Sequence, residues 1–236
     1  MNYEVTPLKK GIVRISAHKI MPKNYLERYG IISIPEKDNT ADAVVCENKI
    51  TLPDGRVLEF KIRPETDDDF WGDEIRYQID KFQDKIPTRI NIEGRPEDTL
   101  MQWNESLNGM DSKKKFGISF KIDDNEQFYG LGEAGREDIK LRGDSYQNWT
   151  VYQFDEIIIP LVMSDQNWGL FICVQDRHFV DIDDFAKGRL TVIGNFDELD
   201  IFVLYGNSMK EMLRLYTDIS GKSMLLPKWG YGLTYD

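Results

Sequence analysis

A polar segment between two apolar stretches carries the side chains in this sequence that are best suited to bind a sugar. It lies inside the stretch from Gln127 to Met163. Guanidinium, carboxylate and amide groups hydrogen-bond hydroxyls, and an indole offers a flat apolar face. The same composition is typical of a solvated hairpin loop, so the segment alone leaves both interpretations open. Its candidate side chains are Arg136, Arg142, Asp144, Gln147, Asn148 and Trp149.

The flanks of this segment predict strands with local irregularities. Gly130 and Gly132 stand one residue apart directly after two aromatic residues. Glycine tolerates positive φ and close approach of another backbone, so we expect a bend or a tight contact there. On the far side, residues 156–163 are apolar and include Pro160, which predicts an edge strand or a strand that starts again after a bulge.

Three blocks of the chain, in this order and spacing, resemble glycoside hydrolase family 31, the α-glucosidase and α-xylosidase family. The first, Phe128-Tyr129-Gly130-Leu131-Gly132-Glu133, resembles the signature of that family's N-terminal β-sandwich. The resemblance is good over residues 116–236 and loose over 1–63, whereas residues 64–115 match nothing in it. The other blocks are Ile159-Pro160-Leu161 with Trp168-Gly169-Leu170-Phe171, and the run from Leu199 to Gly232, which resembles the join to the catalytic barrel.

The resemblance implies an all-β fold, a galactose-mutarotase-like antiparallel β-sandwich with one short C-terminal helix. The sandwich would occupy residues 1–224, and residues 225–236 would begin a (β/α)8 barrel, with its first strand at 228–236. Such a barrel needs about 250 residues, and nine residues follow Pro227. We therefore expect that the rest of the barrel is absent and that this chain is part of a longer protein.

The resemblance also implies retaining hydrolysis of α-glycosidic bonds by the parent enzyme. Retaining glycosidases use two carboxyl groups about 5–5.5 Å apart, and in this family both are aspartates of the barrel. No position here matches either motif, so we assign no catalytic residue and expect the chain alone to be inactive. Its expected role is to brace the barrel, its partner in the same chain, and to lend a loop to the pocket for an oligosaccharide or glycoside.

The sugar-binding residues that the resemblance implies are Asp144, Trp149 and Asp236. In many members a tryptophan of the loop is followed by an aspartate that bonds the sugar. Here Thr150 follows Trp149, and the nearest upstream acid is Asp144. This departure leaves the choice between glucose and xylose open. Asp236 stands at the end of the expected first barrel strand, where active-site residues of such barrels cluster.

Composition narrows the function classes further. The net charge is −11 and the pI is about 4.8, which argues against nucleic acid, because phosphate binding needs clustered Lys and Arg. Cys46 and Cys173 fit no metal or redox motif, so we expect two buried free thiols in a reducing compartment. Neither a signal peptide nor a membrane span is visible, which predicts a cytoplasmic protein without membrane contact.

No cofactor or metal ion is expected. The sequence has no nucleotide-binding loop and no Ser-His-Asp grouping. Asp181, Asp183 and Asp184 with Gly188 faintly suggest a calcium loop, but their spacing departs from the twelve-residue pattern and the closing Glu is absent.

Short apolar runs predict the strands of the sandwich. In residues 11–17, Val13, Ile15 and Ala17 fall on one face, as in a half-buried strand. Pro53-Asp54-Gly55 predicts a hairpin within residues 51–60. The other expected strands are 116–122, 168–174, 179–182, 189–193 and 198–205.

One amphipathic helix is predicted after residue 207. Ser208 and Glu211 fit a capping box, and Gly221 can supply a left-handed C-cap. The apolar stripe at i, i+3, i+4 and i+7 is Met209, Met212, Leu213 and Tyr216.

Two other functions for a chain with this pattern stay open. A free-standing carbohydrate-binding sandwich would bind sugar without a barrel. A mutarotase of the same fold needs acid and base histidines that converge on the sugar, and His18 and His178 are the two histidines of the sequence.

Overall fold

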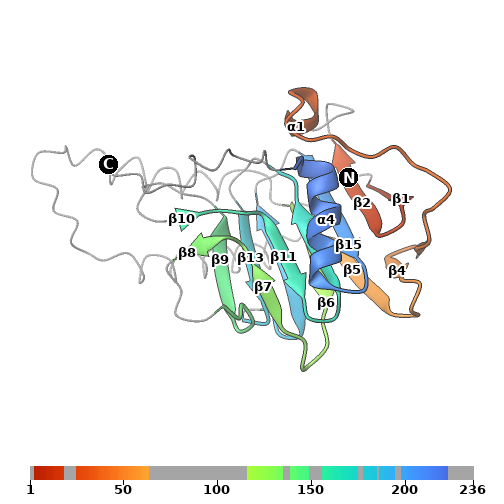
Figure 1. Ribbon diagram of the computed structural model, residues 1–236. Coiled ribbons are helices and arrows are strands. Elements are labelled where there is room, and N and C mark those ends of the chain that lie inside the picture. Colours follow the sequence, from red (N-terminus) through yellow and green to blue (C-terminus); the bar gives the residue numbers. More distant parts are fainter. Residues whose placement is uncertain are drawn as a thin grey trace, which may run out of the picture.

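The computed structural model describes residues 3–18, 25–63, 116–134, 139–148, 156–174, 178–184, 186–194 and 198–222. These ranges form two antiparallel sheets that face each other (Figure 1). The first sheet has six strands, in the order β1-β2-β15-β12-β11-β7. Its strands are β1 (Glu4–Lys9), β2 (Ile12–His18), β15 (Glu198–Tyr205), β12 (Trp168–Ile172), β11 (Leu161–Ser164) and β7 (Phe128–Gly130).

The second sheet has seven strands, in the order β3-β4-β5-β6-β14-β13-β9. A separate pair of short strands joins β8 (Glu133–Ala134) to β10 (Glu156–Ile157). This architecture confirms the predicted all-β, two-sheet fold. The seven strands are β3 (Val44–Cys46), β4 (Lys49–Thr51), β5 (Val57–Arg63), β6 (Phe116–Lys121), β14 (Arg189–Gly194), β13 (His178–Ile182) and β9 (Asp144–Asn148).

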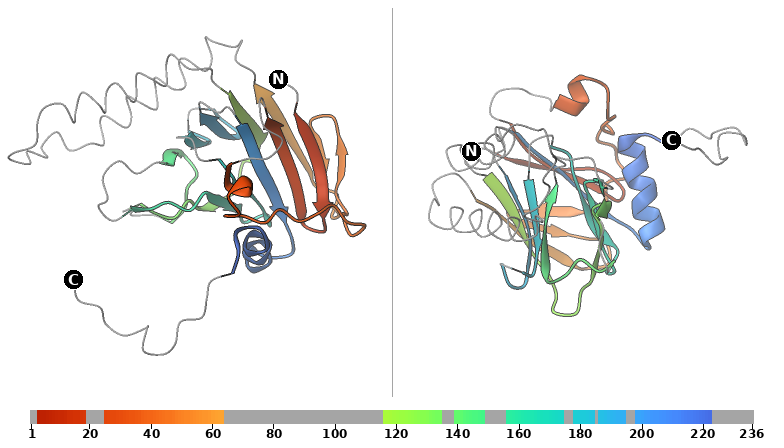
Figure 2. Two further views of the ribbon diagram at one scale, coloured as in Figure 1. Left: turned by 90° about the horizontal axis from the view of Figure 1, so that it is seen from above. Right: turned by 90° about the vertical axis from the view of Figure 1, so that its left-hand side faces the viewer.

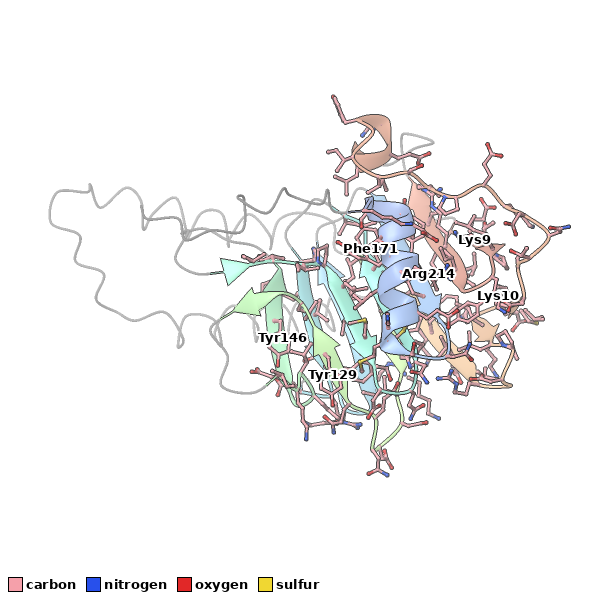
Figure 3. All side chains as sticks on the ribbon, in the orientation of Figure 1. Lys9, Lys10, Tyr129, Tyr146, Phe171 and Arg214 are labelled. Atoms are coloured by element: carbon pink, nitrogen blue, oxygen red, sulfur yellow. The ribbon has the colours of Figure 1, made fainter. Side chains whose placement is uncertain are left out.

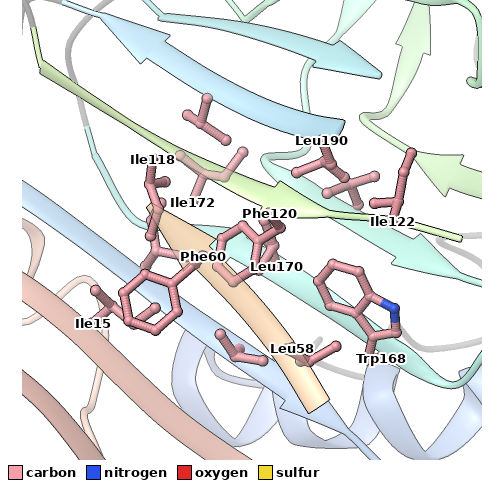
Figure 4. Close-up of a cluster of buried hydrophobic side chains, with 14 of the residues drawn as sticks. Ile15, Leu58, Phe60, Ile118, Phe120, Ile122, Trp168, Leu170, Ile172 and Leu190 are labelled. Carbon is pink, nitrogen blue, oxygen red and sulfur yellow. The ribbon is translucent and has the colours of Figure 1, made fainter. Parts of the chain in front are cut away.

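The main hydrophobic core fills the space between the two sheets (Figure 4). Aromatic rings connect strands of both sheets across it. Phe120 of β6 contacts Phe60 of β5 at 5.8 Å between ring centroids and Trp168 of β12 at 5.7 Å. Phe128 of β7 meets Trp168 edge-on at 6.0 Å. Burial of such large apolar surfaces is the dominant stabilising contribution to a sandwich of this kind.

A second apolar layer covers the outer face of the six-stranded sheet. Helix α4 (Met209–Ser220) lies across this face, outside the sandwich (Figure 2). Phe171 lies on the sheet beside the helix (Figure 3), and its ring contacts that of Tyr216 at 4.9 Å. The strand predicted for residues 11–17 is present, but the prediction that its second face is exposed is wrong at Ile12. Ile12 is as fully buried under the helix as Val13 is in the core.

The predicted helix forms, but a different stripe faces the sheet. Its buried side chains are Met212, Leu215 and Ile219, whereas Leu213 is 44% exposed. The predicted stripe and the buried stripe both include positions 212 and 216. The contact with the sheet buries the stripe that continues through Leu215 to Ile219.

Both ends of α4 differ slightly from the predicted caps. Ser208 accepts a hydrogen bond from the Glu211 N–H (3.2 Å), as predicted. The Glu211 carboxylate accepts from the N–H of Asn207 (2.9 Å) instead of that of Ser208, so the capping box is shifted by one residue. Gly221 ends the helix with φ +89° and ψ 156°, a positive φ without the left-handed helical ψ.

Three described elements of the N-terminal half were not predicted from the sequence: strands β1 and β3 and the one-turn helix α1 (Tyr25–Arg28). The chain after α1 also covers the outer layer, because the Ser33 N–H donates to the Ile219 carbonyl at the end of α4 (2.9 Å). The predicted hairpin is confirmed, with Gly55 at φ +87° between β4 and β5. Cys173 is buried as expected, but Cys46 is exposed, because it lies at the end of the edge strand β3.

Candidate functional site

Residues 141–143 connect one edge of each sheet. β7 is the edge strand of the first sheet and β9 is the edge strand of the second. The Leu141 N–H donates to the Phe128 carbonyl on β7 (2.9 Å), and the Gly143 N–H donates to the Ile182 carbonyl on β13 (2.7 Å). In Figure 1, β7, β8, β9 and β10 lie together on the left of the sandwich. The polar segment singled out in the sequence is thus anchored where the two sheets meet at one edge.

The bend predicted before this segment is present and is tightly packed against backbone. Gly130 has φ +121° and Gly132 has φ +80°, with Leu131 between them at φ +60°. A Cβ at Gly130 would lie 2.2 Å from the Leu161 carbonyl oxygen, and one at Gly132 would lie 1.8 Å from the Ile157 carbonyl oxygen. The break at 158–160, before β11 begins, fits the predicted restart of the strand around Pro160. Both predictions about the flanks are confirmed.

Arg142 joins three parts of the chain through its guanidinium group. Its Nη1 donates to the backbone carbonyls of Asp123 (2.6 Å) and Glu126 (2.7 Å). Its Nε donates to the Asp183 carboxylate at 2.8 Å. The side chain is 12% exposed. Such partly buried, charge-assisted bonds are stronger than exposed ion pairs, so Arg142 holds the connection to β9 against two turns of the sandwich.

Asp183 is fixed by groups beyond Arg142. Its carboxylate also accepts the Gly188 N–H at 2.6 Å. Burial raises the pKa of Asp183, but the bonds from Gly188 and Arg142 outweigh it, and the pKa lies below its usual range. A charged carboxylate is therefore the stable form at neutral pH.

Glu126 is a buried acid that the sequence analysis missed. Its side chain is 2% exposed, and its carboxylate accepts hydrogen bonds from the indole Nε1 of Trp168 and the hydroxyl of Ser164. The second oxygen accepts the Asp123 N–H at 3.1 Å. The run Asp123-Asp124-Asn125 predicts a turn, but nothing in the sequence places the following acid beneath the core tryptophan.

Two of the acids considered for a calcium loop, Asp181 and Asp184, instead accept hydrogen bonds from Ser145 of β9. Asp181 is fully buried, and the Ser145 hydroxyl lies 2.6 Å from its carboxylate and 3.0 Å from that of Asp184. The Ala186 N–H donates to Asp181 at 3.0 Å. In the ranges that the structure covers, no three His, Cys, Asp or Glu side chains gather where they could hold a metal ion.

The three predicted sugar-binding residues are only partly placed. Asp144 is the first residue of β9, is half-buried, and accepts the Ser145 N–H at 2.8 Å. Trp149 and Asp236 lie outside the described residues, as does the expected start of the barrel at 225–236. The structure therefore brings Asp144 next to the Arg142 anchor and leaves its relation to the other two as a prediction.

Two further observations bear on the other functions. His178 is 3% exposed, inside the seven-stranded sheet, where an imidazole has little access to a sugar in solution. None of the helices in the described ranges has the length and apolar character to cross a bilayer.

Comparison with known proteins addresses the resemblance directly. No family model matches the chain. It is 32% identical to an α-xylosidase of Emericella nidulans over 113 residues, which are 46% of this chain and 14% of that protein. It is 28% identical to the α-xylosidase XylQ of Lactiplantibacillus pentosus over 146 residues, which are 60% of this chain and 18% of that protein. The chain thus spans less than a fifth of either relative.

Solved structures share its fold. A GH31 dextranase from Flavobacterium johnsoniae, in complex with isomaltotriose, aligns over 98% of this chain and 29% of its own, with a TM-score of 0.61 and 14% identity. The resemblance to glycoside hydrolase family 31 is confirmed. At that identity the structural match establishes the fold, and the matched part of these enzymes is the N-terminal domain.

Proposed function

We propose that this chain is the N-terminal β-sandwich of an α-glycosidase of the α-xylosidase or α-glucosidase type. The observation that carries the proposal is the pairing of two α-xylosidase relatives with a GH31 fold over 98% of the chain. In this proposal residues 1–224 form the sandwich and residues 225–236 begin the catalytic barrel, which is its partner within the same polypeptide.

The sandwich would contribute binding groups, and the barrel would contribute the chemistry. Retaining hydrolysis needs two carboxyl groups about 5–5.5 Å apart on opposite sides of the scissile bond, and no position here matches the family's catalytic aspartates. The described carboxylates near β9 are engaged by the protein itself, as Asp183 is by Arg142 and Gly188. The chain alone would therefore lack glycosidase activity.

The substrate in this proposal is an oligosaccharide or glycoside with a terminal α-linked xylose or glucose. Asp144, Trp149 and Asp236 would contact it. For Asp144 the support is its place at the start of β9, beside the point where residues 141–143 join both sheets. A cytoplasmic location is part of the proposal, supported by two cysteines that form no disulfide.

Two assays test this function. The longer polypeptide that contains this chain and the chain alone are each incubated with aryl α-xyloside and aryl α-glucoside, and release of the aryl alcohol is measured. We expect the longer polypeptide to hydrolyse at least one of them and the chain alone to hydrolyse neither. In the active protein, Asp144→Asn should raise KM about tenfold, the value of one hydrogen bond to a sugar hydroxyl.

The same material separates the alternatives. Titration of the chain alone with xylose and isomaltotriose should show no measurable binding, whereas a free-standing carbohydrate-binding module would bind. A polarimetric assay of anomer interconversion should show no acceleration, whereas a mutarotase would accelerate it. Hydrolysis by the chain alone, or no hydrolysis of either glycoside by the longer polypeptide, would contradict the proposal.

A further inference from the structure

Arg142 bonds two turns of the sandwich two residues before Asp144. We infer that Arg142 is a positioning residue for Asp144, setting where the carboxylate at the start of β9 stands; its effect on catalysis rests on the function proposed above. The two residues are separated only by Gly143. Arg142 itself would not touch the sugar, because the donors described above are directed at the protein.

The geometry of these bonds requires a planar fork. Nη1 carries two hydrogens, and the carbonyls of Asp123 and Glu126 accept one each, while the single Nε hydrogen goes to Asp183. A lysine ammonium is a point donor on a flexible stem and does not reproduce the fixed spacing of the Nε and Nη1 donors. The guanidinium thus fixes both the distance and the orientation of the chain at residue 142.

The turn that accepts these bonds is itself rigid. The Glu126 carboxylate, buried beneath Trp168 and Ser164, accepts the N–H of Asp123, and the Glu126 N–H donates to the Asp123 carbonyl at 3.2 Å. The two carbonyls that receive Arg142 therefore belong to a turn tied to the main core. Because this turn is fixed to the core, hydrogen bonds to it restrain the position of residue 142. Hydrogen bonds to a mobile exposed loop would not restrain it.

The strand that begins at Asp144 depends on such an anchor. Among the described strands β9 lies at the edge of its sheet, and its ladder of hydrogen bonds runs to β13. Immediately before it, Gly143 has φ +89°, and a Cβ built there would meet no atom within 4 Å. The backbone at 143 thus has room to move if its flanking bonds are lost. Arg142 and the Gly143 N–H bond to Ile182 are among the contacts that hold it, together with the bond from Leu141 to Phe128.

The chain offers a matched control in Arg14. Its guanidinium also binds an acid, Asp200, with Nε and Nη2 at 2.8 and 2.6 Å, and its side chain is 16% exposed against 12% for Arg142. Asp200 is fully buried, whereas Asp183 is 22% exposed, so the loss of Arg14 is the more severe perturbation of the two. Arg14 lies on β2, which is separated from β9 by the sandwich core. Arg14→Ala therefore removes a partly buried arginine–aspartate pair without altering the connection to β9.

The first test measures position without activity. Hydrogen exchange of the β9 amides is compared in the wild-type chain, Arg142→Ala, Arg142→Lys and Arg14→Ala, with each rate corrected for global stability from urea unfolding. We expect exchange at least tenfold faster in Arg142→Ala than in Arg14→Ala, and an intermediate rate in Arg142→Lys. Equal corrected rates in the two alanine variants would overturn the inference. If Arg142→Ala does not fold, Arg142→Lys against Arg14→Lys decides by the same criterion.

The second test uses the longer, active polypeptide and aryl α-xyloside. Arg142→Ala should raise KM about tenfold with kcat within about twofold, and Arg142→Lys should recover part of the loss. Arg14→Ala should leave KM unchanged even where it lowers the melting temperature. An unchanged KM in Arg142→Ala refutes the catalytic consequence. If the wild-type polypeptide hydrolyses no α-glycoside, the proposed function fails, and the exchange result still decides the positioning role.

Discussion

Substitution of Gly132 by alanine should disrupt the bend between β7 and β8 far more than a positive φ alone would. Gly132 has φ +80°, and its Cβ would lie 1.8 Å from the Ile157 carbonyl oxygen, which is 1.2 Å inside the 3.0 Å that real contacts respect. A non-glycine residue at positive φ costs about 1–2 kcal/mol. Relief of the clash requires β10 to move away from β8, which loses hydrogen bonds worth about 1 kcal/mol each and the packing around them.

The expected destabilisation for Gly132→Ala is therefore about 3–5 kcal/mol. Gly55→Ala is the matched control, because Gly55 has φ +87° and a Cβ there would meet no atom within 4 Å. It should cost only the conformational part, about 1–2 kcal/mol. With a urea m-value of about 3 kcal/mol per M, the midpoint should fall by more than about 1 M for Gly132→Ala and by about 0.5 M for Gly55→Ala. Equal shifts would refute the close backbone approach as the reason for glycine at 132.

Three further predictions concern the acidic side chains of Glu126, Asp200 and Asp183. Glu126→Ala should lower the free energy of unfolding by about 3–5 kcal/mol, because it leaves the Trp168 indole N–H buried without its acceptor. Thermal unfolding measures this loss, and a value below about 1 kcal/mol would contradict the prediction. Asp200→Asn should cost about 3–5 kcal/mol by leaving Arg14 without its bidentate partner, measured by urea unfolding, and a neutral effect would show that the pair is dispensable. The hydrogen bonds that depress the pKa of Asp183 in the folded state stabilise the fold above its unfolded pKa of about 3.9, and this contribution is lost as pH falls through the lower folded value. Stability should thus decrease below about pH 4, and Asp183→Asn should flatten that decrease; an unchanged slope would assign the acid sensitivity to other groups.

The elements of this fold were accessible to sequence analysis because their signals are local. Pro53-Asp54-Gly55 is a turn signal within three residues. The glycines at 130 and 132 indicate positions where a neighbouring backbone leaves no room for a side chain. The stripe of α4 that packs inward was not accessible. Leu213 and Leu215 are equally apolar, and only the position of the sheet decides that Leu215 is buried and Leu213 is exposed.

The candidate site shows the same division more sharply. Asp144 and Arg142 attract attention because they belong to a polar segment between apolar runs. Glu126 does not, since an acid in an Asp- and Asn-rich turn usually points to solvent. Its burial under Trp168 follows from a contact between residues 42 positions apart in the chain, and no local pattern encodes such a distance.

The sequence by itself determined the periodicity of the strands, the two glycine-dependent turns, the helix with its N-cap, and the resemblance that led to the family. These depend on steric and hydrogen-bonding preferences over a few neighbouring residues. Only the tertiary structure decided that β15 is buried on both faces, that Ile12 of β2 is buried under the helix, and that Arg142 spans three segments. Those outcomes depend on which surfaces meet, because desolvation and hydrogen-bond geometry are set by groups brought together from distant parts of the chain.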